Sequence, residues 1–297
     1  MGSQALPAEA DVHMIISDVD GTLLDSDHRL HPRTFHALQW LRKNRPSLPI
    51  VIATGKQRTS VIEIREPLNL DVFRASHLNG CVVYNPGGVV ASEVGLDKDT
   101  LIQLYRQFSA AGISTFFYDR EKVYEVQGTD GPIWGDKLRG YGESVVSVDE
   151  SFVQQIQDGS VTIIKAAICQ KAGPELEQSR GWLTQQYAHN AFTMVQALPF
   201  CIELIPTTGS KGIALAKILD LHEPKIQAKN VLSFGDGQND VSMFEIAGYA
   251  VAMANAMPAA VEASTHRTLS NDEGGVGVFL EQLYGFTYEE KPYDYWL

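Results

Sequence analysis

Short apolar runs alternate with stretches of helical spacing in the first part of the chain. Met14–Ile16 and Ile50–Ala53 are apolar runs of strand length, and each stops at polar residues. Apolar residues with helical spacing follow Pro32, which the first turn of a helix tolerates. This alternation predicts a parallel sheet covered on both faces by helices, hence an α/β, doubly wound core. We expect Cys81–Tyr84 to be a further strand of the same pattern.

The pattern changes after residue 84. Residues 97–111 have the spacing of an amphipathic helix, and Ile113–Tyr118 with Val123–Val126 resemble a β-hairpin around a charged turn. Hairpin-like pairs with helices between them predict an antiparallel sheet in a separate α+β domain. From Thr208 the strand–helix alternation resumes. The sequence therefore predicts a core domain formed by residues 1–84 plus 208–297, and an inserted α+β domain formed by residues 85–207.

Four polar signatures stand at predicted strand ends or helix starts of the core. Asp18 and Asp20 follow the first strand, Thr54-Gly55 follows the second, Lys211 opens a helix, and Gly235–Asp240 follows a strand near residue 230. Each signature alone is compatible with an ordinary turn or helix cap. Ligands of open α/β sheets bind beyond the carboxyl ends of the strands, so their joint occurrence predicts one site.

The residue types at these strand ends suit phosphoryl transfer. Asp18 and Asp20 are two residues apart on an extended segment and point the same way. A carboxylate can attack phosphorus and form an aspartyl-phosphate, while a second acid protonates the leaving oxygen. Asp18 and Asp236 supply the oxygens that Mg²⁺ prefers. Lys211 and the Thr54 hydroxyl would hold the phosphoryl oxygens.

Composition and charge restrict the partners. Hydrophobic residues make up 44% and charged residues 20% of the 297-residue chain, which predicts a folded core. The formal net charge of −12 argues against nucleic acid or an acidic membrane as the main partner, although a bound cation and a few lysines still allow a small anionic substrate. The three cysteines lie in or beside apolar runs and are expected to be buried, reduced thiols. No stretch has the length of a transmembrane helix or the layout of a signal peptide, so we expect a cytoplasmic protein.

From about residue 13 to 280 the sequence resembles the haloacid dehalogenase superfamily of phosphatases. It is most similar to the Cof-type branch, whose C2-type cap is inserted between the second and third motifs. The matching segments are Asp18-Val19-Asp20-Gly21-Thr22, Thr54-Gly55, Lys211, and Gly235-Asp236-Gly237-Gln238-Asn239-Asp240.

The resemblance implies a role for each motif. Asp18 would be the nucleophile and Asp20 the acid and base, with the Asp20 backbone carbonyl and the carboxylates of Asp18 and Asp236 as Mg²⁺ ligands. Asn239 and Asp240 would support the metal site.

The resemblance also implies the substrate contacts. The residues expected to bind phosphate or substrate are Thr54, Gly55, Asn79, Lys211 and Asn239. Lys56 departs from the family pattern, which usually has arginine there. Lysine keeps the charge but lacks the planar fork that grips an anion, so no substrate role is carried over to this position.

These features predict a Mg²⁺-dependent hydrolase that releases phosphate from a small organic phosphomonoester, such as a sugar phosphate or a cofactor precursor. One alternative is a phosphomutase acting on a sugar phosphate, and another is a catalytically silent protein that binds a phosphometabolite. The inserted domain is expected to select the leaving group, and its Gly-rich stretch Gln127–Gly142 offers Trp134, Lys137 and Arg139 for that purpose.

Overall fold

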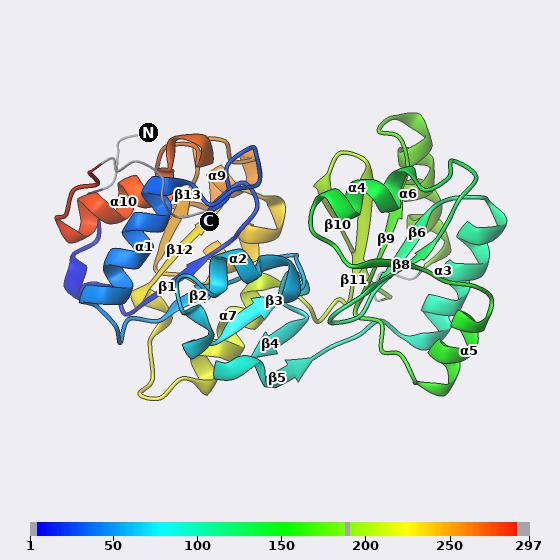
Figure 1. Ribbon diagram of the computed structural model, residues 1–297, viewed down its shortest axis with the longest axis horizontal. Helices are drawn as coiled ribbons and strands as arrows, with labels where there is room; N and C mark the ends of the chain where they lie inside the picture. The colour runs from blue at the N-terminus through cyan, green and yellow to red at the C-terminus, as the bar shows by residue number, and fades with distance from the viewer. Residues whose placement is uncertain (1–4, 188–190, 290–297) are drawn as a thin grey trace.

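The computed structural model describes residues 5–187 and 191–289, which form two bodies lying side by side (Figure 1). One body is built on a five-stranded parallel sheet with the strand order β14-β13-β12-β1-β2. β1 pairs with both β12 and β2, so the first strand of the chain lies inside the sheet. The strands are β1 (Met14–Ser17), β2 (Ile50–Ile52), β12 (Val231–Gly235), β13 (Tyr249–Ala252) and β14 (His266–Arg267).

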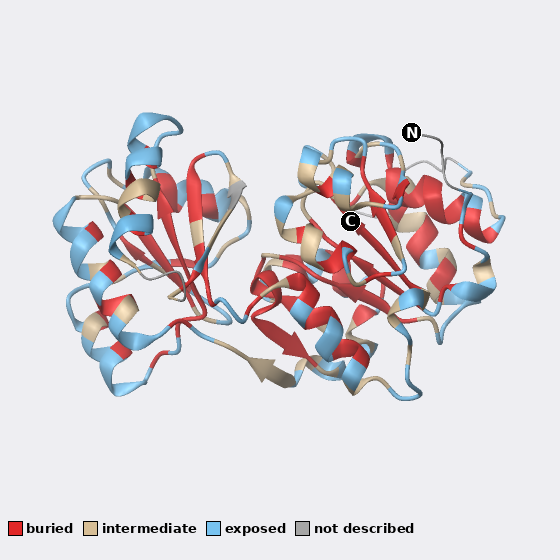
Figure 2. Ribbon diagram, turned by 180° about the vertical axis from the view of Figure 1, so that it is seen from behind, coloured by how far each residue is buried: buried red, intermediate tan, exposed pale blue. Residues whose placement is uncertain are grey.

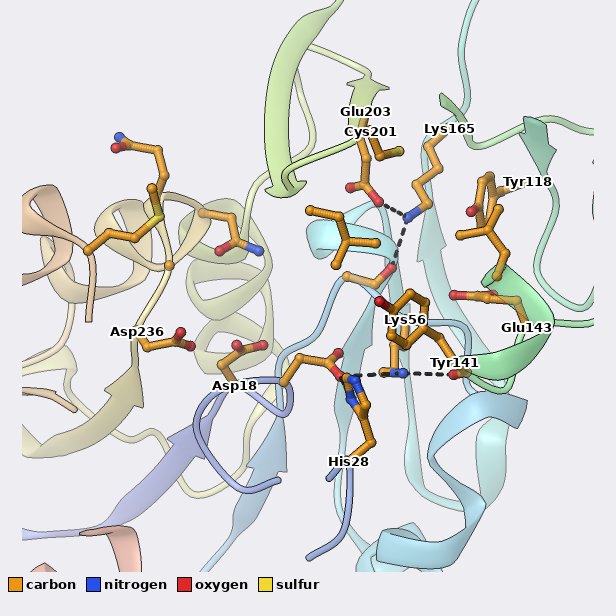
Figure 3. Close-up of a pocket in the computed structure, with 18 residues that line it drawn as sticks. Asp18, His28, Lys56, Tyr118, Tyr141, Glu143, Lys165, Cys201, Glu203 and Asp236 are labelled. Carbon is orange, nitrogen blue, oxygen red and sulfur yellow. Dashed lines mark hydrogen bonds and ion pairs between the residues drawn. The ribbon is translucent and has the colours of Figure 1, made fainter. Parts of the chain in front are cut away.

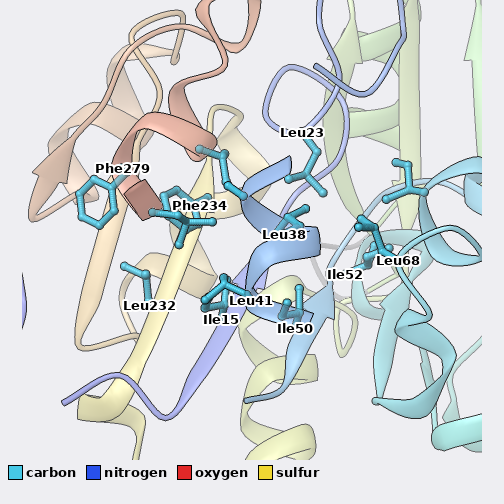
Figure 4. Close-up of a cluster of buried hydrophobic side chains, with 14 of the residues drawn as sticks. Ile15, Leu23, Leu38, Leu41, Ile50, Ile52, Leu68, Leu232, Phe234 and Phe279 are labelled. Carbon is cyan, nitrogen blue, oxygen red and sulfur yellow. The ribbon is translucent and has the colours of Figure 1, made fainter. Parts of the chain in front are cut away.

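Helices cover both faces of the parallel sheet, which explains why every residue of β1 is buried. Ile15 packs on one face with Leu38 and Phe279, which come from α1 and α10 (Figure 4). Ile16 packs on the other face with Leu215 and other residues of α7 and α8. The helices are α1 (Pro32–Asn44), α2 (Ile62–Arg65), α7 (Lys211–Leu221), α8 (Val241–Phe244), α9 (Pro258–Ala263) and α10 (Gly275–Tyr284).

The predicted strand at Cys81–Tyr84 forms, as β4 (Val82–Tyr84), but not in the parallel sheet. It is the middle strand of a separate antiparallel sheet, between β3 (Ala75–His77) and β5 (Val90–Glu93). This part of the prediction was wrong, because an apolar run indicates burial but not the direction of its neighbours. An isolated parallel bridge between Ala53 and Ser76 joins β3 to the end of β2.

The second body contains a six-stranded sheet with the order β10-β11-β9-β6-β7-β8, antiparallel except for the parallel pair β7–β8. We call this sheet and its helices, residues 98–205, the six-strand unit. Its strands are β6 (Thr115–Tyr118), β7 (Val123–Val126), β8 (Val145–Ser147), β9 (Lys165–Cys169), β10 (Thr193–Leu198) and β11 (Cys201–Ile205). Its helices are α3 (Lys98–Ala110), α4 (Ile133–Gly140), α5 (Ser151–Asp158) and α6 (Pro174–Gln186).

The two faces of the six-stranded sheet have different neighbours. Helices α3, α5 and α6 cover one face, where Phe117 packs against Leu104 and Phe152. On the other face Phe116 belongs to a buried cluster that also contains Val82 of β4. This second face is therefore turned toward the body with the parallel sheet. Burial is concentrated on the strands of both sheets, and several of the surrounding helices show one buried and one exposed face (Figure 2). Within the described residues, no helix has the length and apolar character needed to cross a membrane.

Candidate active site

The predicted carboxylates meet where β1 and β12 end. Asp18 directly follows β1, and Asp236 directly follows β12, its neighbour in the sheet. One carboxylate oxygen from each of Asp18, Asp236 and Asp240 lies within 4.8 Å of the others. Adjacent parallel strands end at the same edge of a sheet, so residues more than 200 positions apart become neighbours.

Lys211, the first residue of α7, lies against these carboxylates. Its Nζ donates to Oδ1 of Asp18 and to Oδ1 of Asp240, each at 2.6 Å. The side chains of Lys211 and Asp240 are fully buried. The second oxygen of Asp240 accepts hydrogen bonds from the backbone amides of Asp236 and Gly237, at 2.9 and 2.8 Å. Asp240 thus fixes the lysine with one oxygen and the loop after β12 with the other.

The site carries an excess of negative charge. Burial raises the pKa of Asp18 well above its ordinary value, and the neighbouring Asp240 and Asp236 add to this, although Lys211 opposes it. Burial, helped by Asp240, raises the pKa of Asp236 to about 6. Three carboxylates face a single lysine here, so a divalent cation would relieve the repulsion and favour the ionised forms. Donors that are all oxygen suit a hard cation such as Mg²⁺.

The loop after β1 fits closely around Asp236. Gly21 has a φ of +72°, and a Cβ at this position would lie 2.3 Å from Oδ2 of Asp236. Thr22 Oγ1 donates to Oδ1 of Asp236 at 3.0 Å. Asn255 Nδ2 donates to the carbonyl of Gly21 at 2.8 Å, so it ties this loop to the end of the sheet. These contacts fix the orientation of the Asp236 carboxylate.

Asp20 has different neighbours from Asp18, because the chain turns after Asp18 instead of staying extended as predicted. Its side chain is 41% exposed, with Oδ1 3.4 Å from Lys56 Nζ and 3.7 Å from His28 Nδ1. The Lys56 ammonium also donates to the carbonyl of Tyr141 in the six-strand unit, at 3.0 Å. The two aspartates predicted to act in sequence therefore stand in different surroundings, one buried among carboxylates and one beside Lys56 and His28 at the junction between the bodies.

The residues predicted to bind phosphate or substrate lie around the same strand ends. Thr54 is fully buried after β2, and its Oγ1 accepts from the Lys56 amide at 3.1 Å. Asn79, in the 3₁₀ helix η4 (Leu78–Gly80), accepts at Oδ1 from Asn239 Nδ2 at 2.9 Å. Its Nδ2 donates to Oε2 of Glu203 at 2.8 Å. Asn79 therefore connects the loop after β12 to the six-strand unit.

A cavity of about 180 Å³ lies between the two bodies (Figure 3). Of the predicted site residues, the ones that line it are Asp18, Asp20, Gly55, Asp236 and Asn239. Thr54, Asn79 and Lys211 are buried residues that do not line the cavity. The opposite wall comes from the six-strand unit and includes Tyr118, Tyr141, Glu143, Lys165, Cys201 and Glu203.

The three side chains that the Gly-rich stretch offered for the leaving group are not among the cavity-lining residues. Trp134 is buried in α4 and stacks on Phe200, with ring centroids 5.2 Å apart. Lys137 Nζ lies 4.7 Å from the centre of the Trp134 ring, and Arg139 pairs with Asp136. The stretch forms a helix whose apolar residues pack in the cluster around Phe200, so Trp134 is turned away from the site, whereas Leu138 and Tyr141 of the same stretch line the cavity.

Sequence reasoning missed the charged side chains of the opposite wall. Lys165 opens β9, whose remaining residues are Ala, Ala, Ile and Cys, and Glu203 stands between isoleucine and leucine in β11. A charge is almost never buried without a partner. A single charged residue in an otherwise apolar strand was therefore the signal that could have identified both.

The sequence profile of the haloacid dehalogenase-like hydrolases matches residues 15–280. The chain belongs to this family. An uncharacterized hydrolase of Schizosaccharomyces pombe is 40% identical over 295 residues, which cover 98% of this chain and 96% of the relative. The 5-amino-6-(5-phospho-D-ribitylamino)uracil phosphatase YwtE of Bacillus subtilis is 25% identical over 296 residues, covering 91% and 97%.

Solved structures show the same fold. The crystal structure of a haloacid dehalogenase-like hydrolase from Bacteroides thetaiotaomicron has a TM-score of 0.78 at 22% identity, and the match covers 92% of this chain and 99% of that one. The fold and family membership predicted from the sequence are thereby confirmed. This haloacid dehalogenase-like hydrolase is an enzyme, like its named relatives.

Proposed function

We propose that this hydrolase is a Mg²⁺-dependent phosphatase of small organic phosphomonoesters, such as sugar phosphates or cofactor-precursor phosphates, and that it acts through an aspartyl-phosphate. The observation that carries the proposal is the group Asp18, Lys211, Asp236 and Asp240, placed at the strand ends beside the cavity. The phosphatases among its relatives support the same reaction. Residues 85–207 would act as a cap over a core formed by residues 1–84 and 208–297.

Asp18 would attack phosphorus. Lys211 holds Oδ1 of Asp18, which leaves Oδ2 to form the new bond to phosphorus while the bond from phosphorus to the alcohol oxygen breaks. Asp20 would give its proton to that oxygen. It would then take a proton from the water that attacks the aspartyl-phosphate, so that phosphate is released and the Asp18 carboxylate is restored.

The surroundings of Asp18 would stabilise the charge of the phosphoryl group. Mg²⁺, held by Asp18, Asp236 and the backbone carbonyl of Asp20, would neutralise phosphoryl oxygens. The Lys211 ammonium and the Thr54 hydroxyl would hold further oxygens from the core side. Contact between the two bodies at Lys56 and Tyr141 would restrict access of bulk water.

The test is phosphate release from 4-nitrophenyl phosphate and a panel of sugar phosphates, each with Mg²⁺. We expect Asp18→Asn to reduce turnover by about 10³-fold or more, because an amide is a poor nucleophile, and to leave the melting temperature nearly unchanged. The exposed Asp99, in the first turn of α3, supplies the matched control Asp99→Asn, which should retain activity. Near-normal turnover by Asp18→Asn would contradict the nucleophile assignment, and a wild-type protein without turnover would favour a binding role.

A further inference from the structure

The six-strand unit places a pair of opposite charges on its wall of the cavity. Lys165 Nζ donates to Oε1 of Glu203 at 2.6 Å and to the carbonyl of Gly55 at 3.2 Å. It also lies 4.2 Å from the centre of the Tyr118 ring. Its side chain is 2% exposed and that of Glu203 is 13% exposed. Lys165 is thus held on several sides by protein groups.

The other basic side chains that line the cavity are engaged in the same way. Lys56 faces Asp20 and the carbonyl of Tyr141. His28 faces Asp20 and packs edge-on against the Tyr141 ring, with ring centroids 4.9 Å apart. Among the described residues that line the cavity, each lysine and histidine therefore already faces a carboxylate.

Glu143 is the carboxyl group with spare hydrogen-bonding capacity on this wall. Its Oε2 is buried and has no hydrogen-bond partner in the described structure. Figure 3 shows its side chain reaching from the six-strand unit toward the cavity, near Tyr141. Burial raises the pKa of Glu143, although the nearby ammonium groups of Lys165 and Lys56 oppose the rise. Burying an oxygen without a hydrogen bond destabilises the folded protein. A ligand hydroxyl or amino group that donates a hydrogen bond to this oxygen would remove that cost.

We propose that Glu143 accepts hydrogen bonds from hydroxyl or amino groups of the leaving alcohol, in a subsite that it forms beside Glu203, whose two oxygens already accept from Lys165 and Asn79. The enzyme then prefers monophosphates of neutral or cationic, polyhydroxylated alcohols. It discriminates against leaving groups that carry a second phosphate or a carboxylate, because such a group would meet two carboxylates and no unpaired cation. This inference rests on the proposed phosphatase function and adds to it the class of substrate.

The test compares kcat/KM of wild type and Glu143→Gln for sorbitol 6-phosphate, fructose 1,6-bisphosphate and 4-nitrophenyl phosphate. Glu150→Gln is the matched control, because Glu150 is an exposed carboxylate outside the cavity. Glu143→Gln should lower kcat/KM for sorbitol 6-phosphate by about tenfold, as expected for a lost hydrogen bond to a charged acceptor. The value for 4-nitrophenyl phosphate, which has no hydroxyl groups on its leaving group, should change by less than about twofold. Glu150→Gln should change none of the values.

A charge reversal gives the complementary result. Glu143→Lys should raise kcat/KM for fructose 1,6-bisphosphate relative to sorbitol 6-phosphate, because a cation then faces the second phosphate. Equal losses for all three esters in Glu143→Gln, or a wild-type preference for the bisphosphate, would overturn the subsite while leaving the phosphatase proposal intact. If no ester is turned over, the phosphatase proposal fails. Calorimetric binding of the same sugar phosphates to Asp18→Asn and to Asp18→Asn with Glu143→Gln then decides the subsite by itself.

Discussion

The fit of Gly21 against Asp236 leads to a prediction for a single residue. Gly21→Ala should raise the Mg²⁺ concentration needed for half-maximal activity by about tenfold or more, because the new Cβ displaces the Asp236 carboxylate. Gly87 has a similar φ of +77° but nothing within 4 Å of its would-be Cβ. Gly87→Ala therefore carries the same backbone cost, about 1–2 kcal/mol, without the clash. A metal titration of both variants checks this, and equal shifts would show that the contact with Asp236 is unimportant.

His77 should make stability depend on pH. Its Nδ1 contacts the carbonyl of Lys56 at 3.2 Å, its Nε2 is buried without a partner, and burial lowers its pKa to about 3. Below about pH 6.5 the unfolded chain takes up a proton at this histidine and the folded chain does not. The free energy of unfolding should therefore fall as the pH falls from 6.5 toward 3, with a limiting slope of about 1.4 kcal/mol per pH unit from this group.

Urea unfolding of wild type, His77→Gln and His13→Gln between pH 7 and pH 5 measures this dependence. The slope should be smaller in His77→Gln, since the other titrating groups are common to all three proteins. His13 is exposed, so His13→Gln should keep the wild-type slope. Identical slopes in all three proteins would mean that His77 takes up a proton in the folded state.

At the scale of elements, the start of α7 connects stability to the site. Ser210 Oγ accepts from the amide of Ile213 at 3.1 Å and caps the helix that begins with Lys211. Asp97 caps α3 in the same way through the amide of Thr100. Ser210→Ala and Asp97→Ala should each lower the free energy of unfolding by about 1 kcal/mol. Only Ser210→Ala should also lower kcat/KM, and a loss of activity in both variants would indicate a general effect of destabilisation.

The elements also show how far the sequence determines the fold and the site. Helix α1 and strands β1 and β2 were predicted within a few residues, because local periodicity and proline positions decide them. The meeting of Asp18 with Asp236 followed from a general rule for strand ends. The antiparallel pairing of β4 and the burial of Trp134 in α4 depend on partners distant in the chain, which local patterns do not specify.

The cavity wall formed by the six-strand unit could likewise not be predicted from local sequence patterns. Lys165 and Glu203 are paired because β9 and β11 are neighbours in the sheet, with Glu203 opposite Ala167. Nothing in the spacing of the two residues along the chain indicates that register. The core side of the site follows from short motifs, whereas the opposite wall follows from the topology of the six-strand unit.

At the scale of the whole molecule, Mg²⁺ should stabilise the folded state. A ligand whose free concentration is 100 times its dissociation constant adds about 2.7 kcal/mol to the free energy of unfolding, when only the folded protein binds it. The melting temperature should therefore be higher in excess Mg²⁺ than in chelator. Asp236→Asn should remove most of this difference, and Asp99→Asn should retain it. Equal melting temperatures of the wild type in Mg²⁺ and in chelator would contradict the metal site without any assay of activity.

The position of β1 between β2 and β12 has a consequence for synthesis on the ribosome. All strands of the six-strand unit lie within residues 115–205, so its sheet can close as soon as that segment has emerged. β1 emerges earlier, yet one of its edges stays unpaired until Val231–Gly235 follows. The nascent chain must therefore carry a mostly apolar strand with an unpaired edge while the later unit folds, and we expect it to be most prone to aggregate in this interval.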